Sequence, residues 1–132
     1  MENDARLTLV KTMMEEFAAK GTAELLLNHL ADDVKWKTTA PADTPIHERF
    51  TGPDGVREYF RRVDELLVTE EFSVEGYFQS GDKVVVLGIE RLRLRRSAAE
   101  STCEWATVFT FNRDRNRIAE VLVIEDLSFL IS

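Results

Sequence analysis

The spacing of apolar residues changes once along this chain, and the change limits what the chain can fold into. Up to Thr69 apolar residues recur about every 3.6 residues, which is typical of amphipathic helices, whereas after Thr69 they alternate, which is typical of strands. Helices followed by strands with short links predict a single α+β domain over residues 1–132. Its helices should cover one face of an antiparallel sheet.

Cap and turn residues place the elements more closely. Helices are expected to begin near Asn3, Thr22 and Gly52 and to end near Gly21, Asp32 and Leu67. An extended segment should start at Val34, and later strands should span Phe72–Phe78, Lys83–Arg95, Ser101–Phe111 and Arg117–Leu130. The segment 37–53 holds the chain's three prolines and predicts a long loop, either an ordered connector or a lid over a pocket.

Charge and cysteine content exclude several classes of protein. The chain has 24 acidic and 17 basic residues, a net charge of −7, which argues against nucleic-acid binding and against adsorption to an anionic membrane. It contains no apolar run long enough to cross a membrane, and its acidic start is unlike a signal peptide. The single cysteine, Cys103, cannot form an intrachain disulfide and should be a small core residue. We therefore expect a cytoplasmic protein.

The sequence carries no signature of a metal or cofactor site. His29 and His47 lie far apart and have no cysteine cluster nearby, so they lack the spacing of zinc ligands. Glycine-rich phosphate loops, nucleophile elbows and dinucleotide fingerprints are also missing. We expect neither a metal nor a cofactor.

The last predicted strand is apolar on both faces. Leu122 and Ile124 point to one side, and Val121 and Val123 point to the other. One face can cover the helices, but a large exposed apolar patch is rare on a monomer. We therefore predict a homodimer that forms through the outer face of the sheet.

Five segments, taken in order, resemble motifs of the nuclear-transport-factor-2-like superfamily, above all its SnoaL-like branch. They are Leu30–Trp36, Gly52–Phe60, Gly81–Val86, Trp105–Phe111 and Val121–Asp126. The resemblance implies a cystatin-like cone, in which three N-terminal helices pack on a strongly curved antiparallel sheet with a pocket at its wide end. Such proteins include polyketide cyclases, ketosteroid isomerases, epoxide hydrolases, dehydratases and non-catalytic binding domains, so the fold does not give the function.

The resemblance also indicates which chemistries keep their residues. Ketosteroid isomerases need a carboxylate base and two oxyanion donors, but the matching positions hold Thr38, Met14 and Thr107, so standard isomerase activity is not expected. SnoaL-type cyclases pair a final-strand aspartate, here Asp126, with a histidine where this chain has Thr107 or a neighbour. An epoxide hydrolase would draw on Asp126, Asp33 and one of the arginines at 91, 93 and 95.

Asp126 is the candidate catalytic residue. It shares strand parity with Leu122 and Ile124, so its carboxyl would lie in an apolar cavity if that face lined the cone. Burial would raise its pKa and make it a general acid or base. The structural alternative is a carboxylate that bonds to a neighbouring side chain.

A second group of residues is expected to form the pocket wall. They are Trp36, Tyr59, Glu90, Trp105, Thr107, Phe109 and Asp33. Each has a structural alternative: the aromatic rings as core, Glu90 in an ion pair on its strand, and Asp33 held by loop backbone. The arginines at 91, 93 and 95 alternate with leucines, so they should lie on the opposite face, paired with Glu100 and Glu104.

Two functions stay open. The first is a pocket that binds a small apolar or polyketide-like organic molecule and carries out cofactor-independent acid–base catalysis of the isomerase, cyclase or hydrolase type. The second is a non-catalytic dimeric module for ligand binding or assembly. A large cavity with a carboxyl in its wall would favour the first function, and a cone filled by its own side chains would favour the second.

Overall fold

The computed structural model describes residues 3–114 and 116–131. Its elements are α1 (Asn3–Lys20), α2 (Glu24–Leu27), β1 (Leu30–Thr38), β2 (Phe50–Thr51), α3 (Gly52–Leu66), β3 (Leu67–Ser80), β4 (Lys83–Leu94), β5 (Glu100–Phe111), β6 (Ile118–Glu125) and a 3₁₀ helix at Ser128–Ile131. The predicted α+β class and the three N-terminal helices are confirmed.

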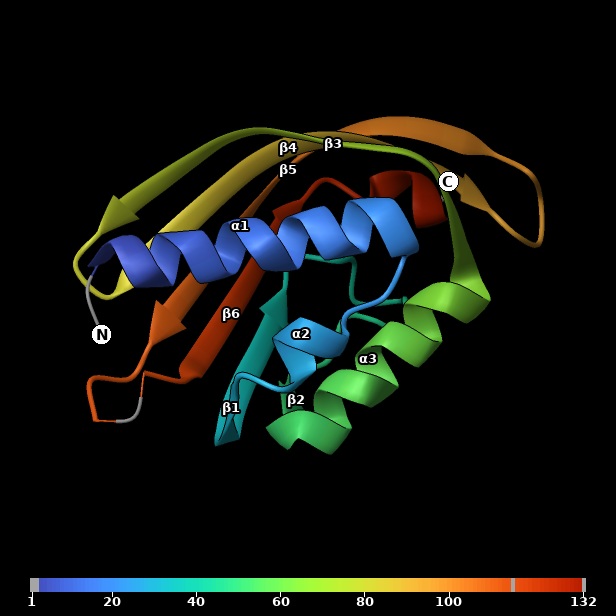
Figure 1. Cartoon of the computed structure of the whole chain (residues 1–132). Coiled ribbons are helices and arrows are strands. Elements are labelled where there is room, and N and C mark those ends of the chain that lie inside the picture. The colour runs from blue at the N-terminus through green and yellow to red at the C-terminus, as the bar shows by residue number, and fades with distance from the viewer. Residues whose placement is uncertain (1–2, 115, 132) are drawn as a thin grey trace.

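The six strands form one sheet in the order β2-β1-β6-β5-β4-β3. Strands β3 to β6 are antiparallel neighbours, as predicted, but β1 pairs with β6 in parallel, so the sheet is mixed and a wholly antiparallel sheet was wrong. Strand β1 pairs with β2 in antiparallel orientation on its other edge. Figure 1 shows the sheet bending over α1, with α2 and α3 on the same concave side; the sheet does not close on itself.

Several boundaries differ from those predicted. The second helix ends at Leu27 and not near Asp32, so β1 begins at Leu30 and not at Val34, and the short strand β2 lies within the segment 37–53 that was predicted as a loop. Strand β3 begins at Leu67, directly after α3, because Leu67 is already extended and the chain enters the sheet without a turn. A register shift between Thr69 and Glu71 interrupts the alternation there and hides this start in the sequence. Strand β6 ends at Glu125 instead of Leu130, since the Asp126 carboxylate accepts a hydrogen bond from the Ser128 N–H where the chain turns into the 3₁₀ helix.

The predicted faces of β4 are confirmed. Val84, Val86 and Leu92 are buried on the concave side of the sheet. The arginines lie on the other face, where Arg91 pairs with Glu71 and Glu100, and Arg93 pairs with Glu70. Cys103 is buried, as expected for a core residue. Within the described residues, no helix combines the length and apolar character needed to cross a bilayer.

A buried arginine fastens α1 to two turns of the sheet. The Arg6 guanidinium donates to Asp82 Oδ1 at 3.0 Å in the β3–β4 turn and to Asn116 Oδ1 at 2.8 Å before β6, and it lies over the Phe111 ring. Only 6% of Arg6 is exposed. The ion pair therefore lies largely out of water, where removing one partner is costly.

We expect Arg6→Ala to lower the free energy of unfolding by about 2 kcal/mol, because the substitution removes both hydrogen bonds and the ring contact. Urea unfolding measures this loss. The control is Arg113→Ala, because Arg113 bonds the same Asp82 at 2.8 Å from a side chain that is 85% exposed. This control should change stability by less than about 0.5 kcal/mol, and equal losses for the two variants would contradict the prediction.

Candidate functional site

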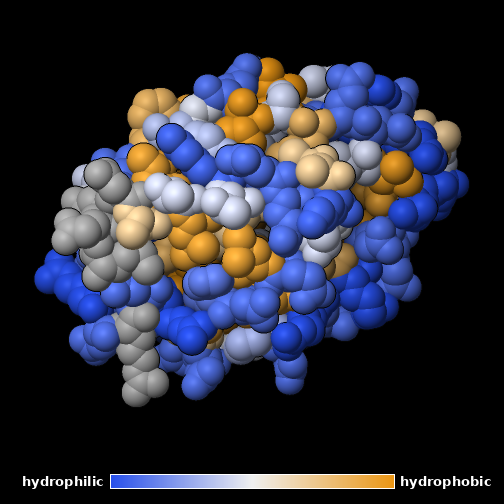
Figure 2. Space-filling model, in the orientation of Figure 1, coloured by the Kyte–Doolittle hydropathy of each residue, from blue (hydrophilic) through white to orange (hydrophobic). Residues whose placement is uncertain are grey.

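The concave side of the sheet encloses a cavity of about 910 Å³. All three helices and strands β1 and β3 to β6 contribute to its wall, with Met13 and Phe17 from α1, Leu26 from α2 and Tyr59 from α3 among the residues. A cavity of this size accommodates a drug-sized organic molecule. Figure 2 shows apolar atoms in a recess just below α1, framed by hydrophilic residues.

Aromatic rings form much of the cavity wall. Trp36 contacts Tyr59 and Phe60, with ring centroids 5.2 and 5.4 Å apart. Across the cavity Phe72 stacks on Trp105 at 5.2 Å and an interplanar angle of 14°. The wall therefore offers flat apolar surfaces with ring faces and edges, which suits a ligand with rings or with a compact charge.

Gly88 makes room for the Trp105 ring. The two residues are register partners on β4 and β5, and a Cβ on Gly88 would lie 2.2 Å from Trp105 Cζ2 and 2.4 Å from the Ser73 carbonyl oxygen. A methyl group cannot fit between an indole and a neighbouring strand at these distances. The missing side chain thus allows the indole to lie flat across the sheet.

Two carboxyl groups lie in this apolar surrounding. Glu90 on β4 and Glu125 on β6 both line the cavity, and they interact directly across the intervening strand β5. Glu125 is 8% exposed, and its Oε2 atom is buried without a hydrogen-bond partner. A buried carboxyl next to a second acid is an arrangement that enzymes use for catalytic proton transfer.

Burial raises the pKa of both acids. Desolvation is the main cause for Glu125, and the hydrogen bond and negative charge of Glu90 raise its pKa further. Desolvation also raises the pKa of Glu90, while its hydrogen bond with Glu125 acts in the opposite direction. Both acids therefore hold their protons more tightly than exposed carboxyls do, and Glu125 holds its proton more tightly than Glu90.

Two indole N–H groups are also unpartnered. Trp36 and Trp105 are 4% and 6% exposed, and neither Nε1 atom has a hydrogen-bond acceptor among the described residues. Both side chains line the cavity. Buried donors normally find a partner, so an acceptor that enters the cavity would satisfy a group that the protein leaves open.

The mouth of the cavity is charged but balanced. Three arginines at the rim each have an acidic partner: Arg57 pairs with Asp54, Arg61 with Glu58 and Glu65, and Arg95 with Asp64. The guanidinium groups of Arg61 and Arg62 hold the pKa of Glu58 at about 2. The exposed Glu58 carboxylate is therefore stabilised in its charged form, unlike the buried pair inside.

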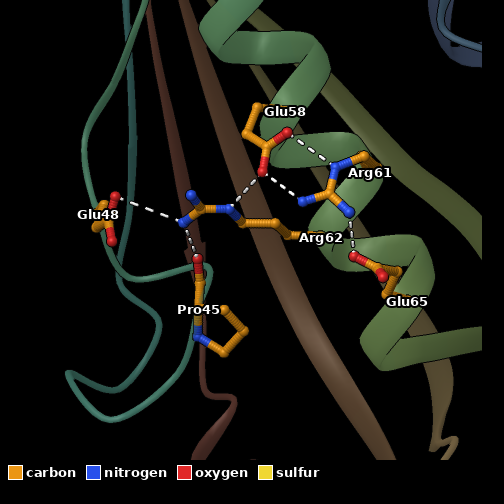
Figure 3. Close-up of polar contacts among 6 residues, drawn as sticks. All are labelled: Pro45, Glu48, Glu58, Arg61, Arg62 and Glu65. Carbon is orange, nitrogen blue, oxygen red and sulfur yellow. Dashed lines mark hydrogen bonds and ion pairs between the residues drawn. The ribbon is translucent and has the colours of Figure 1, made fainter.

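The loop predicted over residues 37–53 is an ordered connector. Figure 3 shows Arg62 of α3 reaching it, where Arg62 donates to the Pro45 carbonyl oxygen at 2.9 Å and lies 3.4 Å from Glu48. Thr38 donates to the Ile46 carbonyl oxygen at 2.8 Å. Ile46 is buried and forms part of the cavity wall, so the loop closes this side of the cavity.

Six of the residues predicted for the site meet at the cavity. They are Trp36, Tyr59, Glu90, Trp105, Thr107 and Phe109. Asp33 does not join them, because it is an exposed residue of β1, between the exposed Asp32 and the buried Val34, and does not end a helix. The alternative for Glu90, an ion pair on its strand, is not found, since Glu90 interacts with a second acid and not with an arginine.

The predicted place of Asp126 was wrong. It is exposed, and hydrogen bonds from Ser128 lower its pKa. The prediction assigned the wrong face of β6 to the cavity. Ile124 is exposed on the outer side, whereas Val121 and Glu125 are buried. The residue that sequence reasoning missed is therefore Glu125, one position earlier. The sequence did contain a signal for Glu125, because this residue shares strand parity with Val121, Val123 and Leu127.

The described residues contain no group of three or more histidine, cysteine or acidic side chains arranged to hold a metal ion. The two acids of the cavity fall short of the ligand number that a divalent cation needs. The expectation of a cofactor-free protein stays a prediction.

Comparisons with known proteins agree with this architecture. A family model described as a SnoaL-like domain matches residues 10–121. No curated protein matches. Among solved structures, an NTF2-like protein of unknown function from Burkholderia pseudomallei has a TM-score of 0.82 at 22% identity, over 99% of this chain and 96% of that one.

Two other similar structures hold small molecules. TerC, co-crystallised with polyporic acid, has a TM-score of 0.77 at 19% identity, over 96% of this chain and 98% of that one. A protein from Catenulispora acidiphila with a ketosteroid isomerase-like fold, in complex with trimethylamine, has a TM-score of 0.69 at 17% identity, over 88% and 86% of the two chains. At these identities the likeness shows a shared fold.

Proposed function

This chain belongs to the SnoaL-like family, and on that premise we propose that it binds a small, largely apolar organic molecule in its cavity and transfers a proton to or from it without a cofactor. The observation that carries the proposal is the buried Glu125 carboxyl, with an unpartnered Oε2 atom in the wall of an aromatic cavity. Structural neighbours that hold polyporic acid and trimethylamine support a small organic ligand.

Glu125 and Glu90 take different roles in this proposal. Glu125, which holds its proton more tightly, acts as the general acid, and its carboxylate takes the proton back when the reaction runs in the other direction. Glu90 interacts with the Glu125 carboxyl and helps to keep it protonated. The Trp36 and Trp105 N–H groups orient an acceptor atom of the ligand. Proton transfer by a positioned acid contributes typically about 10²- to 10⁴-fold to a rate.

The competing function is a non-catalytic binding module. The replacement of the isomerase residues by Thr38, Met14 and Thr107 favours it. In a binding module the buried acids would hold a ligand but would not exchange protons with it.

A ligand screen with one substitution separates these functions. Aromatic polyketides, steroids and terpenoids are tested for thermal stabilisation and for quenching of tryptophan fluorescence, and any ligand found is followed for hydrogen exchange or turnover. We expect Glu125→Gln to retain binding within about threefold and to lower the rate by at least about 10²-fold.

Asp126→Asn is the matched control, because it alters the neighbouring, exposed acid. It should leave both binding and rate unchanged. Binding without any chemistry in the wild type would favour the binding module, and the absence of any ligand would contradict the proposal as a whole.

We also propose that the chain forms a homodimer through the outer face of the sheet. Leu87 and Ile124 are exposed there and flank Ala106 in one row across β4, β5 and β6. Light scattering should give twice the mass of one chain, and Ile124→Glu should give a single chain, because a charge in an apolar interface is costly. Ile131→Glu, at an exposed apolar residue outside the sheet, should leave the mass unchanged.

A cytoplasmic location also stays a proposal.

A further inference from the structure

The cavity contains an acidic pair that no cation among the described residues balances. On the basis of the proposed ligand-binding function, we infer that its ligand is an organic ammonium ion that also carries an oxygen acceptor. The ammonium group would lie between the aromatic rings and the Glu90–Glu125 pair, with the acceptor at the indole N–H groups of Trp36 and Trp105. This assigns a charge and a functional group to a ligand so far described only as small and apolar.

The first argument is the missing counter-ion. Among the described residues that line the cavity, the basic side chains are Arg57, Arg61 and Arg95, and each bonds an acid at the rim. None of them interacts with the carboxyls of Glu90 and Glu125. Loss of one proton from the pair leaves one negative charge in the cavity wall, and a buried charge is normally paired. A monovalent cation on the ligand supplies the missing partner.

The second argument is the aromatic wall. The face of an aromatic ring attracts a cation that lies within about 6 Å of it, and aromatic cages are a known way to bind quaternary ammonium groups. The protein's own cations lie over Phe111, Tyr77 and Phe50, which are outside the set of cavity-lining residues. The ring faces of Trp36, Tyr59 and the Phe72–Trp105 stack are therefore available to a ligand.

The third argument is the pair of open donors. Both indole N–H groups are more than nine-tenths buried and unpartnered. An alkylammonium ion without an acceptor would leave them unsatisfied after it displaced water, which is costly in a buried site. A carbonyl, ester or ether oxygen on the same molecule satisfies them. An anionic ligand would fit these donors but would be repelled by the acidic pair.

The experiment compares three probes of similar size by calorimetry and tryptophan fluorescence. They are phenacyltrimethylammonium, its neutral carbon isostere 3,3-dimethyl-1-phenylbutan-1-one, and the anion 3-benzoylpropionate. We expect the ammonium probe to bind at least about tenfold more tightly than the neutral ketone, and the anion to bind more weakly than either.

Substitutions locate the selectivity. Glu90→Gln combined with Glu125→Gln should lower the affinity for the ammonium probe by about tenfold and change the affinity for the ketone by less than about threefold, because no acid is then left to carry the charge. Glu125→Gln alone leaves the Glu90 carboxyl, whose hydrogen bond with the group at position 125 acts to lower its pKa, and should retain the affinity for both probes within about threefold. Glu104→Gln removes an exposed acid from the opposite face of β5 and is the control that should change neither. Circular dichroism confirms that each variant is folded. Equal losses for the ammonium probe and the ketone would indicate a merely structural role and overturn the inference.

The affinity for the ammonium probe should also rise with pH while that for the ketone stays constant, because the pair gains negative charge. The titratable groups that face the pair are Tyr59 on α3 and Cys103 on β5. Burial raises the pKa of both groups, so they stay neutral while the acidic pair gains negative charge. The remaining charged lining residues are Glu24, Arg57, Arg61, Asp64, Glu70, Glu71 and Arg95.

Each outcome is informative. Tighter binding of the ketone than of the ammonium probe overturns the inference and leaves the proposed apolar ligand site intact. Failure of all three probes to bind contradicts both the inference and the proposed function. Ammonium selectivity that survives both glutamine substitutions also overturns the inference, because it would place the cation away from the acidic pair.

Discussion

Gly88→Ala should lower the free energy of unfolding by about 3 kcal/mol, the largest loss that we expect from the addition of one methyl group to this chain. The added Cβ would lie 2.2 Å from Trp105 Cζ2 and 2.4 Å from the Ser73 carbonyl oxygen. One of these neighbours is backbone and the other is a ring stacked on Phe72, so neither can move without breaking strand pairing or the stack. Urea unfolding, followed by circular dichroism, measures the loss.

The same chain offers a matched control. Gly76 is also a strand glycine, but a Cβ there would meet only the exposed Phe78 ring, at 3.2 Å. Since that ring can turn into solvent, Gly76→Ala should change stability by less than about 1 kcal/mol. Comparable losses at the two positions would show that glycine matters in these strands for backbone reasons and not for the space that it leaves to Trp105.

Glu125→Gln should make the protein more stable than the wild type at about pH 8, by at least about 2 kcal/mol, and leave its stability nearly unchanged at about pH 4.5. In the unfolded chain the carboxyl loses its proton near the ordinary pKa of 4.5, whereas burial and Glu90 raise the pKa in the folded chain. Above the ordinary pKa the folded state therefore binds more protons than the unfolded state. Stability that Glu125 contributes at low pH is then lost as the pH rises.

The measurement is urea unfolding of both proteins across this pH interval. The wild type should lose stability steadily as the pH rises, and the variant should show a much shallower slope. Asp126→Asn is the control, because hydrogen bonds from Ser128 lower the pKa of Asp126 and keep it ionised over the whole interval. This control should retain the wild-type slope. A wild type that gains stability toward high pH would contradict the burial of a proton at Glu125.

These two predictions concern one row of the sheet, in which Trp105 has Gly88 and Glu125 as its register partners, and both describe a cost to folding. Gly88 gives up side-chain packing so that Trp105 can form the wall, and Glu125 places a carboxyl where it lowers stability at neutral pH. An apolar residue at position 125 would avoid that second cost. Local features that lower stability are expected at functional sites, which is why we place the chemistry of this protein here.

Local patterns in the sequence were enough to predict the fold class, the three helices and six residues of the cavity wall. These follow from periodicity, since Trp36 and Tyr59 each share a face with apolar residues at the right spacing, whereas the family resemblance rests on five short motifs. The inward face of β4 was readable for the same reason, because its outward face is marked by arginines that alternate with leucines.

Which acids meet in the cavity depends on how distant strands pair in the sheet. Strand β6 is apolar on both faces, so its parity gives no direction, and a shift of one residue exchanges a buried position for an exposed one. The pairing of Trp105 with Glu125 in the sheet resolves this, placing Glu125 inside and leaving Asp126 in solvent. The parallel pairing of β1 with β6 could not be predicted from local patterns either. It joins segments about eighty residues apart in the sequence, and no short turn between them indicates that they pair.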